Sequence, residues 1–180
     1  MTSFLTLRLH GTIPAATGRE LKAALRQAQE AGNNHRLAQK QFFAKFDTVL
    51  DRARIGPAYF ENEKIAEVLA GEIMMLEETG FVVHGFAILL NHAHVVLHLP
   101  KSSNLSFAKA LDLLHLRTGT ACRRLVRPKL PPEAEFWQVG WFDYEVQDEA
   151  ELTRVLAYVR GNARQAGLPA RFQEWPYVNE

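Results

Sequence analysis

Two histidines, with one residue between them, lie in an apolar segment of the chain. His92 and His94 belong to the run FAILLNHAHVVLH at residues 86–98. Residues two apart in an extended strand project from the same face, roughly 6.5–7 Å apart. Two imidazoles held in this way can bind one divalent metal ion. The alternative is that one histidine faces solvent or bonds to a backbone carbonyl, because buried polar groups need a partner.

A second pair of chemically useful residues lies near the end of the chain. Residues 149–168 follow a helical pattern, in which Tyr158 and Asn162 are four residues apart and therefore share a face. A tyrosine oxygen can act as a covalent nucleophile, and an asparagine oxygen can bind a hard metal ion such as Mg²⁺ or Mn²⁺. The alternatives are a half-buried aromatic at Tyr158 and part of a helix cap at Asn162, which lies beside Gly161.

The chain resembles the HUH single-tyrosine transposases, and within them the REP-associated tyrosine transposases. The strand motif NHxH with following aliphatics is matched by Asn91, His92, Ala93, His94, Val95 and Val96. The downstream signature is matched by Phe136, Trp137, Gln138, Phe142, Asp143, Asp148, Glu149, Glu151, Tyr158, Val159, Asn162, Gly167 and Leu168. The resemblance covers nearly the whole chain and is least specific over residues 17–60. Three positions depart from the usual pattern: Leu90 and Ala163 replace prolines, and Tyr144 replaces a histidine.

The resemblance implies a metal-dependent transposase or endonuclease that cleaves and rejoins single-stranded DNA near palindromic hairpins. Tyr158 would be the nucleophile that forms a 5′-phosphotyrosine, and His92, His94 and Asn162 would hold Mg²⁺ or Mn²⁺. Asp143 is an alternative oxygen donor. Two other functions stay open: a domesticated, non-catalytic protein that binds hairpin DNA, and a phosphoesterase in which water attacks in place of tyrosine.

Positively charged residues provide candidates for contacts to DNA. The formal net charge is only +1, which argues against indiscriminate coating of nucleic acid but permits a local basic surface. The candidates are Arg117, Arg123, Arg124, Arg154, Arg160 and Arg164, with Trp137 as a side chain that could stack on an unpaired base. Each arginine is about as readily explained as part of a solvated helix face, and Trp137 as a core residue.

The periodicity of the sequence predicts an α+β fold, a ferredoxin-like antiparallel sheet with helices on one face. A helical insertion at about residues 17–60 follows the first strand, and a C-terminal helix carries the tyrosine. The expected strands are residues 4–9, 81–90, 93–99 and 137–146, and the expected helices are 18–31, 35–53, 62–78, 105–126 and 149–165. Ser103 or Asn104 is the expected cap of the fourth helix.

Length and composition indicate a single domain over residues 1–180. Hydrophobic residues make up 47% of the 180 residues, enough for a core, and a single cysteine, Cys122, excludes a disulfide framework. No signal peptide or membrane span is apparent, which predicts a cytoplasmic protein. The resemblance leaves open whether the protein acts as a monomer or a homodimer.

Overall fold

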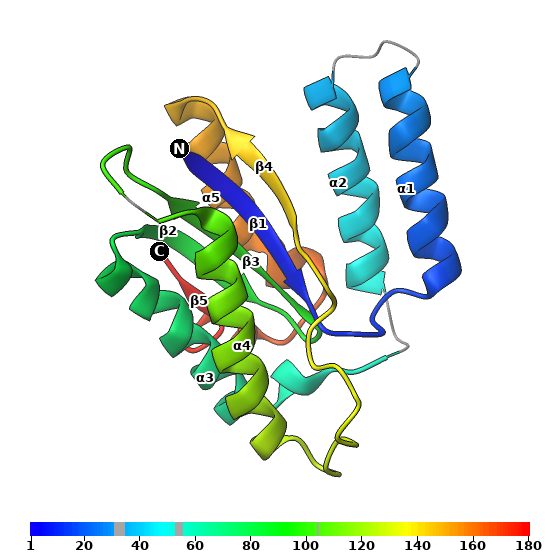
Figure 1. Cartoon of the computed structure of the whole chain (residues 1–180), viewed down its shortest axis with the longest axis vertical. Helices are drawn as coiled ribbons and strands as arrows, with labels where there is room; N and C mark the ends of the chain where they lie inside the picture. Colours follow the sequence, from blue (N-terminus) through cyan, green and yellow to red (C-terminus); the bar gives the residue numbers. More distant parts are fainter. Residues whose placement is uncertain (31–34, 53–55, 104) are drawn as a thin grey trace.

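A five-stranded antiparallel sheet forms the centre of the fold, with strand order β4-β1-β3-β2-β5 (Figure 1). The computed structural model describes residues 1–30, 35–52, 56–103 and 105–180. The strands are β1 (Thr2–Arg8), β2 (Val82–Ile88), β3 (His92–His98), β4 (Phe142–Val146) and β5 (Val178–Asn179). The helices are α1 (Ala15–Glu30), α2 (His35–Arg52), α3 (Glu63–Met74), α4 (Phe107–Leu125) and α5 (Glu149–Gln165). Short 3₁₀ segments occupy Tyr59–Glu61, Met75–Thr79 and Ala170–Gln173.

The connectivity β1–α3–β2–β3–α4–β4 with the spatial order β4-β1-β3-β2 is a ferredoxin-like arrangement. The α+β fold expected from the sequence is therefore confirmed. β5 adds a short strand beside β2, and the helices α1 and α2 are inserted between β1 and α3.

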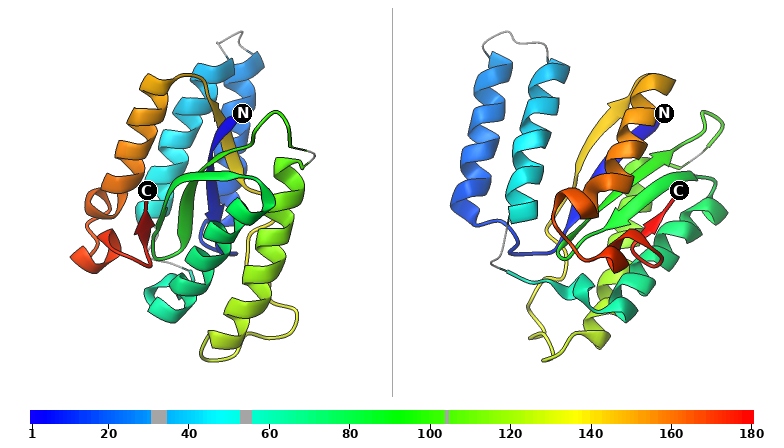
Figure 2. Two further views of the ribbon diagram at one scale, coloured as in Figure 1. Left: turned by 90° about the vertical axis from the view of Figure 1, so that its left-hand side faces the viewer. Right: turned by 180° about the vertical axis from the view of Figure 1, so that it is seen from behind.

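The two faces of the sheet carry different cores because successive strand residues alternate sides. Leu5, Val95 and Leu97 point to one face, where α3 and α4 cover them. Phe4 and Val96 point to the other face and pack against Val155 and Val159 of α5. α4 lies in front of the sheet in Figure 1, and α5 comes to the front when the molecule is seen from behind (Figure 2, right).

The inserted helices α1 and α2 form an antiparallel pair beside β4 and α5 (Figure 2). Aromatic residues of α2 attach this pair to the sheet. Phe43 stacks on Phe142 of β4 with the ring centroids 5.2 Å apart, and the Phe42 ring is tilted against the same ring at 5.5 Å. Phe43 also makes an edge contact with Phe4 at 4.9 Å. The insertion therefore covers part of the same sheet face as α5.

Three predicted boundaries are wrong for identifiable physical reasons. The helix expected over residues 62–78 is α-helical only to Met74 and continues as a 3₁₀ turn to Thr79. Gly80, at φ 90°, ends it in the left-handed conformation. The N-cap of α4 is Ser106, which accepts from Lys109 N, and Ser103 lies before it; Asn104 lies outside the described residues.

The strand expected over residues 137–146 begins only at Phe142. Trp137 forms an isolated bridge with Leu9, and Gly140 turns the chain at φ 76° before β4 starts.

Among the described residues, no helix has the length and apolar character needed to cross a bilayer.

Candidate metal centre and tyrosine site

His92 and His94 project from β3 toward the side of the sheet covered by α2 and α5. Their ring centroids lie 4.9 Å apart, and the two side chains are 1% and 0% exposed. The His94 ring stacks on Phe4, whose side chain belongs to the same core. The alternation expected of an extended strand thus brings both imidazoles to one face.

Each imidazole is oriented by a hydrogen bond through its Nδ1 atom. His92 Nδ1 lies 2.7 Å from Asn91 Oδ1, and because that oxygen only accepts, Nδ1 carries the proton. His94 Nδ1 lies 3.0 Å from the Thr6 hydroxyl, which can accept in the same way. Hydrogen bonds of this kind fix the tautomer and leave the Nε2 lone pair available for a metal ion.

Asp47 of α2 completes a group of three potential metal ligands. Its Oδ1 atom lies 3.0 Å from His94 Nε2 and 3.9 Å from His92 Nε2, and the three ligand atoms lie within 4.8 Å of one another. Asp51, one helical turn further along α2, places Oδ1 3.9 Å from His92 Nε2. The sequence pattern predicts the two histidines as metal ligands but neither of these carboxylates.

Five buried polar atoms at this centre have no hydrogen bond of normal geometry to any residue that the structure describes. They are His92 Nε2, His94 Nε2, Asp47 Oδ1, Asp51 Oδ1 and Asn162 Oδ1. Buried polar atoms without a partner are rare in proteins, and several of them in one place call for a missing binding partner. Two imidazole nitrogens with carboxylate and amide oxygens are a donor set that suits a divalent cation such as Mn²⁺ or Mg²⁺.

Burial and mutual charge set the protonation of these groups. Burial, together with the charge of His94, lowers the pKa of His92 to about 3, so this imidazole is neutral at pH 7. Burial alone would raise the pKa of Asp47, but its contacts with His94 and His92 hold that pKa below its usual value. Burial and the neighbouring Asp47 raise the pKa of Asp51 to about 6. The two carboxylates thus differ: the histidines favour the charged form of Asp47, whereas burial and Asp47 disfavour the charged form of Asp51.

Tyr158 of α5 lies close to His94. Its ring centroid lies 5.7 Å from that of His94, and its hydroxyl accepts a hydrogen bond of 2.9 Å from Asn162 Nδ2. Asn162 is fully buried, so its amide is fixed between the tyrosine and the carboxylate of Asp47, which it also contacts. A donor held against the phenol oxygen favours negative charge on that oxygen.

Tyr158, Asp47 and Asp51 line one cleft of about 450 Å³ between α2, β4 and α5. Tyr144 and Arg154 line it as well. The phenol and two of the candidate metal ligands are therefore reachable from the same opening. Tyr144 occupies the position at which the resemblance leads one to expect a histidine, and burial together with the charge of Glu151 raises its pKa to about 12.

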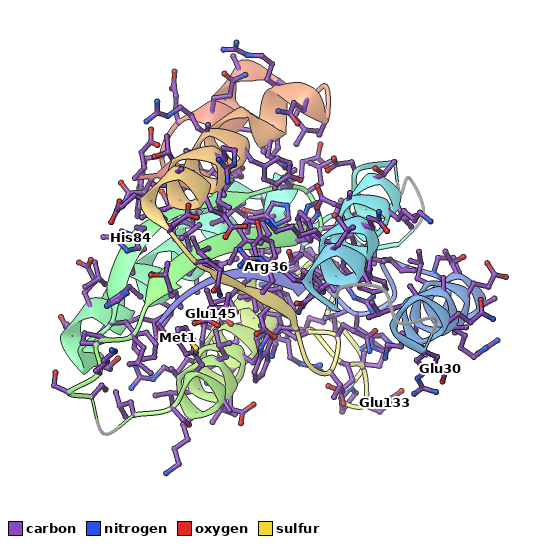
Figure 3. The ribbon with its side chains drawn as sticks, turned by 90° about the horizontal axis from the view of Figure 1, so that it is seen from above. Met1, Glu30, Arg36, His84, Glu133 and Glu145 are labelled. Carbon is purple, nitrogen blue, oxygen red and sulfur yellow. The ribbon has the colours of Figure 1, made fainter. Side chains whose placement is uncertain are left out.

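An ionic cluster joins α2 to the start of α5 above this cleft. The Glu151 carboxylate is only 4% exposed and pairs with Arg36 and Lys40 of α2. It also accepts from Gln147 N at 2.9 Å. Viewed from above, Arg36 lies on the side of α2 that faces the sheet and α5 (Figure 3). Although burial opposes it, bonding to Lys40, Gln147 N and Arg36 lowers the pKa of Glu151 to about 2.

The three predicted arginines of α5 differ in their surroundings. Arg154 lines the cleft. Arg160 pairs with Glu180, and Arg164 donates to Gln173 Oε1 at 3.5 Å. Of these three arginines, only Arg154 lines the same cleft as Tyr158.

The predicted residues on α4 and after it lie on the opposite face of the sheet. Arg117 pairs with Glu72 of α3 at 3.6 Å, and Arg123 donates to main-chain oxygens of the following loop. Arg124 is in the last turn of α4. Trp137 is 5% exposed and donates from Nε1 to Thr118, which places it in the core. The structure does not bring these four residues to the tyrosine site.

Asp143, the alternative oxygen donor, is also separated from the centre. It is exposed on β4 and pairs in register with Leu5, whose side chain faces α3 and α4. The carboxylates that do reach the histidines come from α2. The only local sequence signal for them was the spacing of four between Asp47 and Asp51 in a predicted helix.

Comparison with known proteins gives a structural likeness. No known family profile and no curated protein sequence matches the chain. A solved structure of a REP-associated tyrosine transposase bound to a REP hairpin superposes with a TM-score of 0.53 at 14% sequence identity. The match covers 98% of this chain and 74% of the other. At this identity the likeness defines the α+β fold, which the two proteins share.

Proposed function

We propose that this protein is a metal-dependent endonuclease and transposase that cleaves and rejoins single-stranded DNA near palindromic hairpins. The observation that carries the proposal is that Tyr158 and Asp47 line one cleft, with the buried His92 and His94 grouped around Asp47 and the His94 ring close to Tyr158. The fold shared with a hairpin-bound tyrosine transposase supports the choice of DNA as substrate. The proposed compartment is the cytoplasm, and the proposed state is a monomer or a homodimer.

His92, His94 and Asp47 are the residues that would hold Mg²⁺ or Mn²⁺, with the Asn162 amide oxygen as a further donor. Such an ion supplies Lewis-acid stabilisation of the charge that develops on a phosphate. The protein prepares this site by keeping the His92 imidazole neutral and by orienting the two imidazoles through Asn91 and Thr6. An Asp–His–His set extends the ligands predicted from the sequence by a carboxylate.

Tyr158 is the proposed nucleophile. Its phenol oxygen would form a bond to the scissile phosphorus, and the bond from phosphorus to the 3′ oxygen would break. The phenolic proton passes to water in the cleft, and the departing 3′ oxygen takes up a proton to become a hydroxyl. The 5′-phosphotyrosine conserves the phosphodiester energy, so attack by a 3′-hydroxyl can reverse the step and rejoin DNA. Asn162 positions the phenol by donating to its oxygen.

The proposed DNA contacts begin with Arg154, which lines the cleft beside the nucleophile. A guanidinium there can hold a phosphate through two parallel hydrogen bonds. Arg160 and Arg164 on the same helix would contact more distant parts of the strand. The remaining candidates lie on the opposite face of the sheet: Arg117, Arg123, Arg124 and Trp137. A role of these residues in DNA binding would require the DNA to wrap around the edge of the sheet.

The experiment compares the parent protein with Tyr158→Phe, using a labelled single strand that carries a hairpin and Mn²⁺. The parent should form a covalent adduct that survives denaturing electrophoresis. Tyr158→Phe should form none and should bind the hairpin as tightly as the parent, because only one oxygen is removed. Tyr144→Phe, in the same cleft, is the matched control and should keep the adduct.

Other outcomes identify the competing functions. Cleavage without an adduct, unchanged in Tyr158→Phe, would show a phosphoesterase that uses water. Hairpin binding with no cleavage in the parent would show a non-catalytic DNA-binding protein.

A further inference from the structure

A second cavity, rich in positive charge, lies beside the metal centre. It has a volume of about 390 Å³ and is formed by the end of β1, the start of α1 and Gln138. Four of its lining residues carry basic groups: Arg8, His10, Arg19 and Lys22. None of the described lining residues is an aspartate or a glutamate. A cavity with this lining attracts an anion.

Arg8 gives this cavity its strongest binding group. Its guanidinium lies over the ring of Phe46, 5.6 Å from the centroid, and is thereby held against α2. Its Nη1 atom is buried and has no hydrogen-bond partner among the described residues. A guanidinium keeps its charge, and leaving a buried charged donor without an acceptor is costly. An anion bound in the cavity would satisfy this donor.

The first turn of α1 also favours the binding of an anion in this cavity. Ala15, the first residue of this 16-residue helix, lines the cavity, and the first turn contains no acidic residue. The N–H groups at a helix start lack internal partners and carry partial positive charge, which favours phosphate. Lys22 and Arg19 project from the next turns of the same helix into the cavity lining.

The cavity is close to the proposed catalytic site. Arg8 pairs with His92 in the register of β1 and β3, so their Cα atoms face each other across neighbouring strands. Arg8 also follows Phe4 and Thr6 at intervals of two, on the face that carries the metal centre. Arg8 therefore lies on the strand next to His92, on the same face of the sheet as the metal centre.

We propose that this cavity binds a second phosphate of the DNA strand, next to the one attacked by Tyr158. The proposal rests on the proposed function for the source of the phosphate. Its role is to hold the strand in register, so that one particular phosphodiester lies at the phenol. Arg8 is the central donor, and Lys22, Arg19 and the start of α1 surround the bound group.

The test measures binding of a labelled hairpin with a single-stranded flank, in EDTA and over a range of salt concentrations. Lys22→Met and Arg8→Met should each weaken binding, roughly tenfold for Arg8, because a charged hydrogen bond to phosphate is lost. The slope of log K against log salt should fall by about 0.7 for each phosphate contact removed from a single strand. Arg26→Met, an exposed cation of α1 outside the cavity, is the matched control and should leave the slope unchanged.

Equal slopes for Lys22→Met, Arg26→Met and the parent would overturn the proposal. Titration with inorganic phosphate, followed by calorimetry, tests whether the cavity binds a free phosphate ion instead of a phosphate of DNA. Saturable phosphate binding that Lys22→Met abolishes, together with an unchanged DNA slope, would assign the cavity to a free phosphate ligand and overturn the DNA assignment. If Arg8→Met does not fold, the salt dependence is measured with Lys22→Met and Arg19→Met instead. A reduced slope in a protein that forms no tyrosine adduct would support this site while refuting the cleavage proposal.

Discussion

The two faces of the sheet are built for different purposes. The face under α3 and α4 buries aliphatic and aromatic side chains such as Leu97, Leu111 and Leu114. The face under α2 and α5 buries His92, His94 and Asp47 among its aromatic residues, with several polar atoms left unpaired. Apolar burial stabilises a fold, whereas unpaired buried polar atoms cost stability. The face under α3 and α4 therefore supplies stability, whereas the face under α2 and α5 retains a binding site and is less stabilising.

The largest expected effect is on the apolar face. Leu114→Ala removes a side chain that is 1% exposed and should lower the free energy of unfolding by about 3 kcal/mol through lost burial and a residual cavity. Urea denaturation measures the change. Leu116→Ala on the same helix, where the side chain is 67% exposed, should change stability by less than about 0.5 kcal/mol. Equal losses in the two variants would contradict the assignment of this core.

Asp47→Asn tests the polar face through metal binding. Without metal, the variant should be slightly less stable than the parent at pH 7, because it loses the contacts of the carboxylate with His94 and His92 that hold the pKa of Asp47 below its usual value. With Mn²⁺ at about 100 times its dissociation constant, the parent should gain about 2.7 kcal/mol and the variant almost nothing. Thermal unfolding with and without Mn²⁺ measures both. Asp112→Asn, an exposed position on α4, should keep the full gain.

Thr6→Val examines the support of the metal centre. Valine has nearly the shape of threonine but cannot accept from His94 Nδ1, so the imidazole loses its orienting bond. Affinity for Mn²⁺, measured by titration calorimetry, should fall by roughly 10–100-fold. The matched control is Thr2→Val, which removes the same kind of bond from His98 Nδ1, away from the centre. An equal fall in affinity in both variants would refute the role of Thr6.

The smallest expected effect concerns pH and the link between α2 and α5. Bonding lowers the pKa of Glu151 from 4.5 to about 2, so its stabilising contribution is present above pH 4.5 and is lost as the pH falls toward 2. Glu151→Gln should cost on the order of 1 kcal/mol at pH 7, allowing for solvent screening of Arg36 and Lys40. The difference from the parent should shrink between pH 4.5 and 2 in urea denaturation. A difference that does not change with pH would contradict the ionic interpretation.

The parts of the site that depend on local periodicity could be predicted from the sequence. Alternation on one strand placed His92 and His94 on one face, and the helical repeat placed Tyr158 beside Asn162. The tyrosine helix has the predicted bounds, 149–165, because the Asp148 side chain caps it by accepting from Glu151 N. These features are set by a few neighbouring residues.

Other contacts of the site form only when separate helices and strands pack together, and local sequence patterns do not predict such contacts. Asp47 reaches the histidines only because aromatic residues of α2 fix that helix on the sheet. Thr6 meets His94 through the register of β1 with β3. The arginines of α4 looked equivalent to those of α5 in sequence, yet the sheet separates the two sets.

The position of Asp47 affects how the inserted helices are tied to the sheet when a metal ion is bound. Asp47 and the histidines lie on opposite sides of α3 and β2 in the sequence, so an ion that binds both closes a long loop of polypeptide. Such a closure acts as a reversible cross-link, and its entropic effect on the flexible chain grows with the length enclosed. Metal would thus fasten the inserted helical pair to the sheet as a disulfide does in a secreted protein. Chelation would release that fastening without breaking a covalent bond.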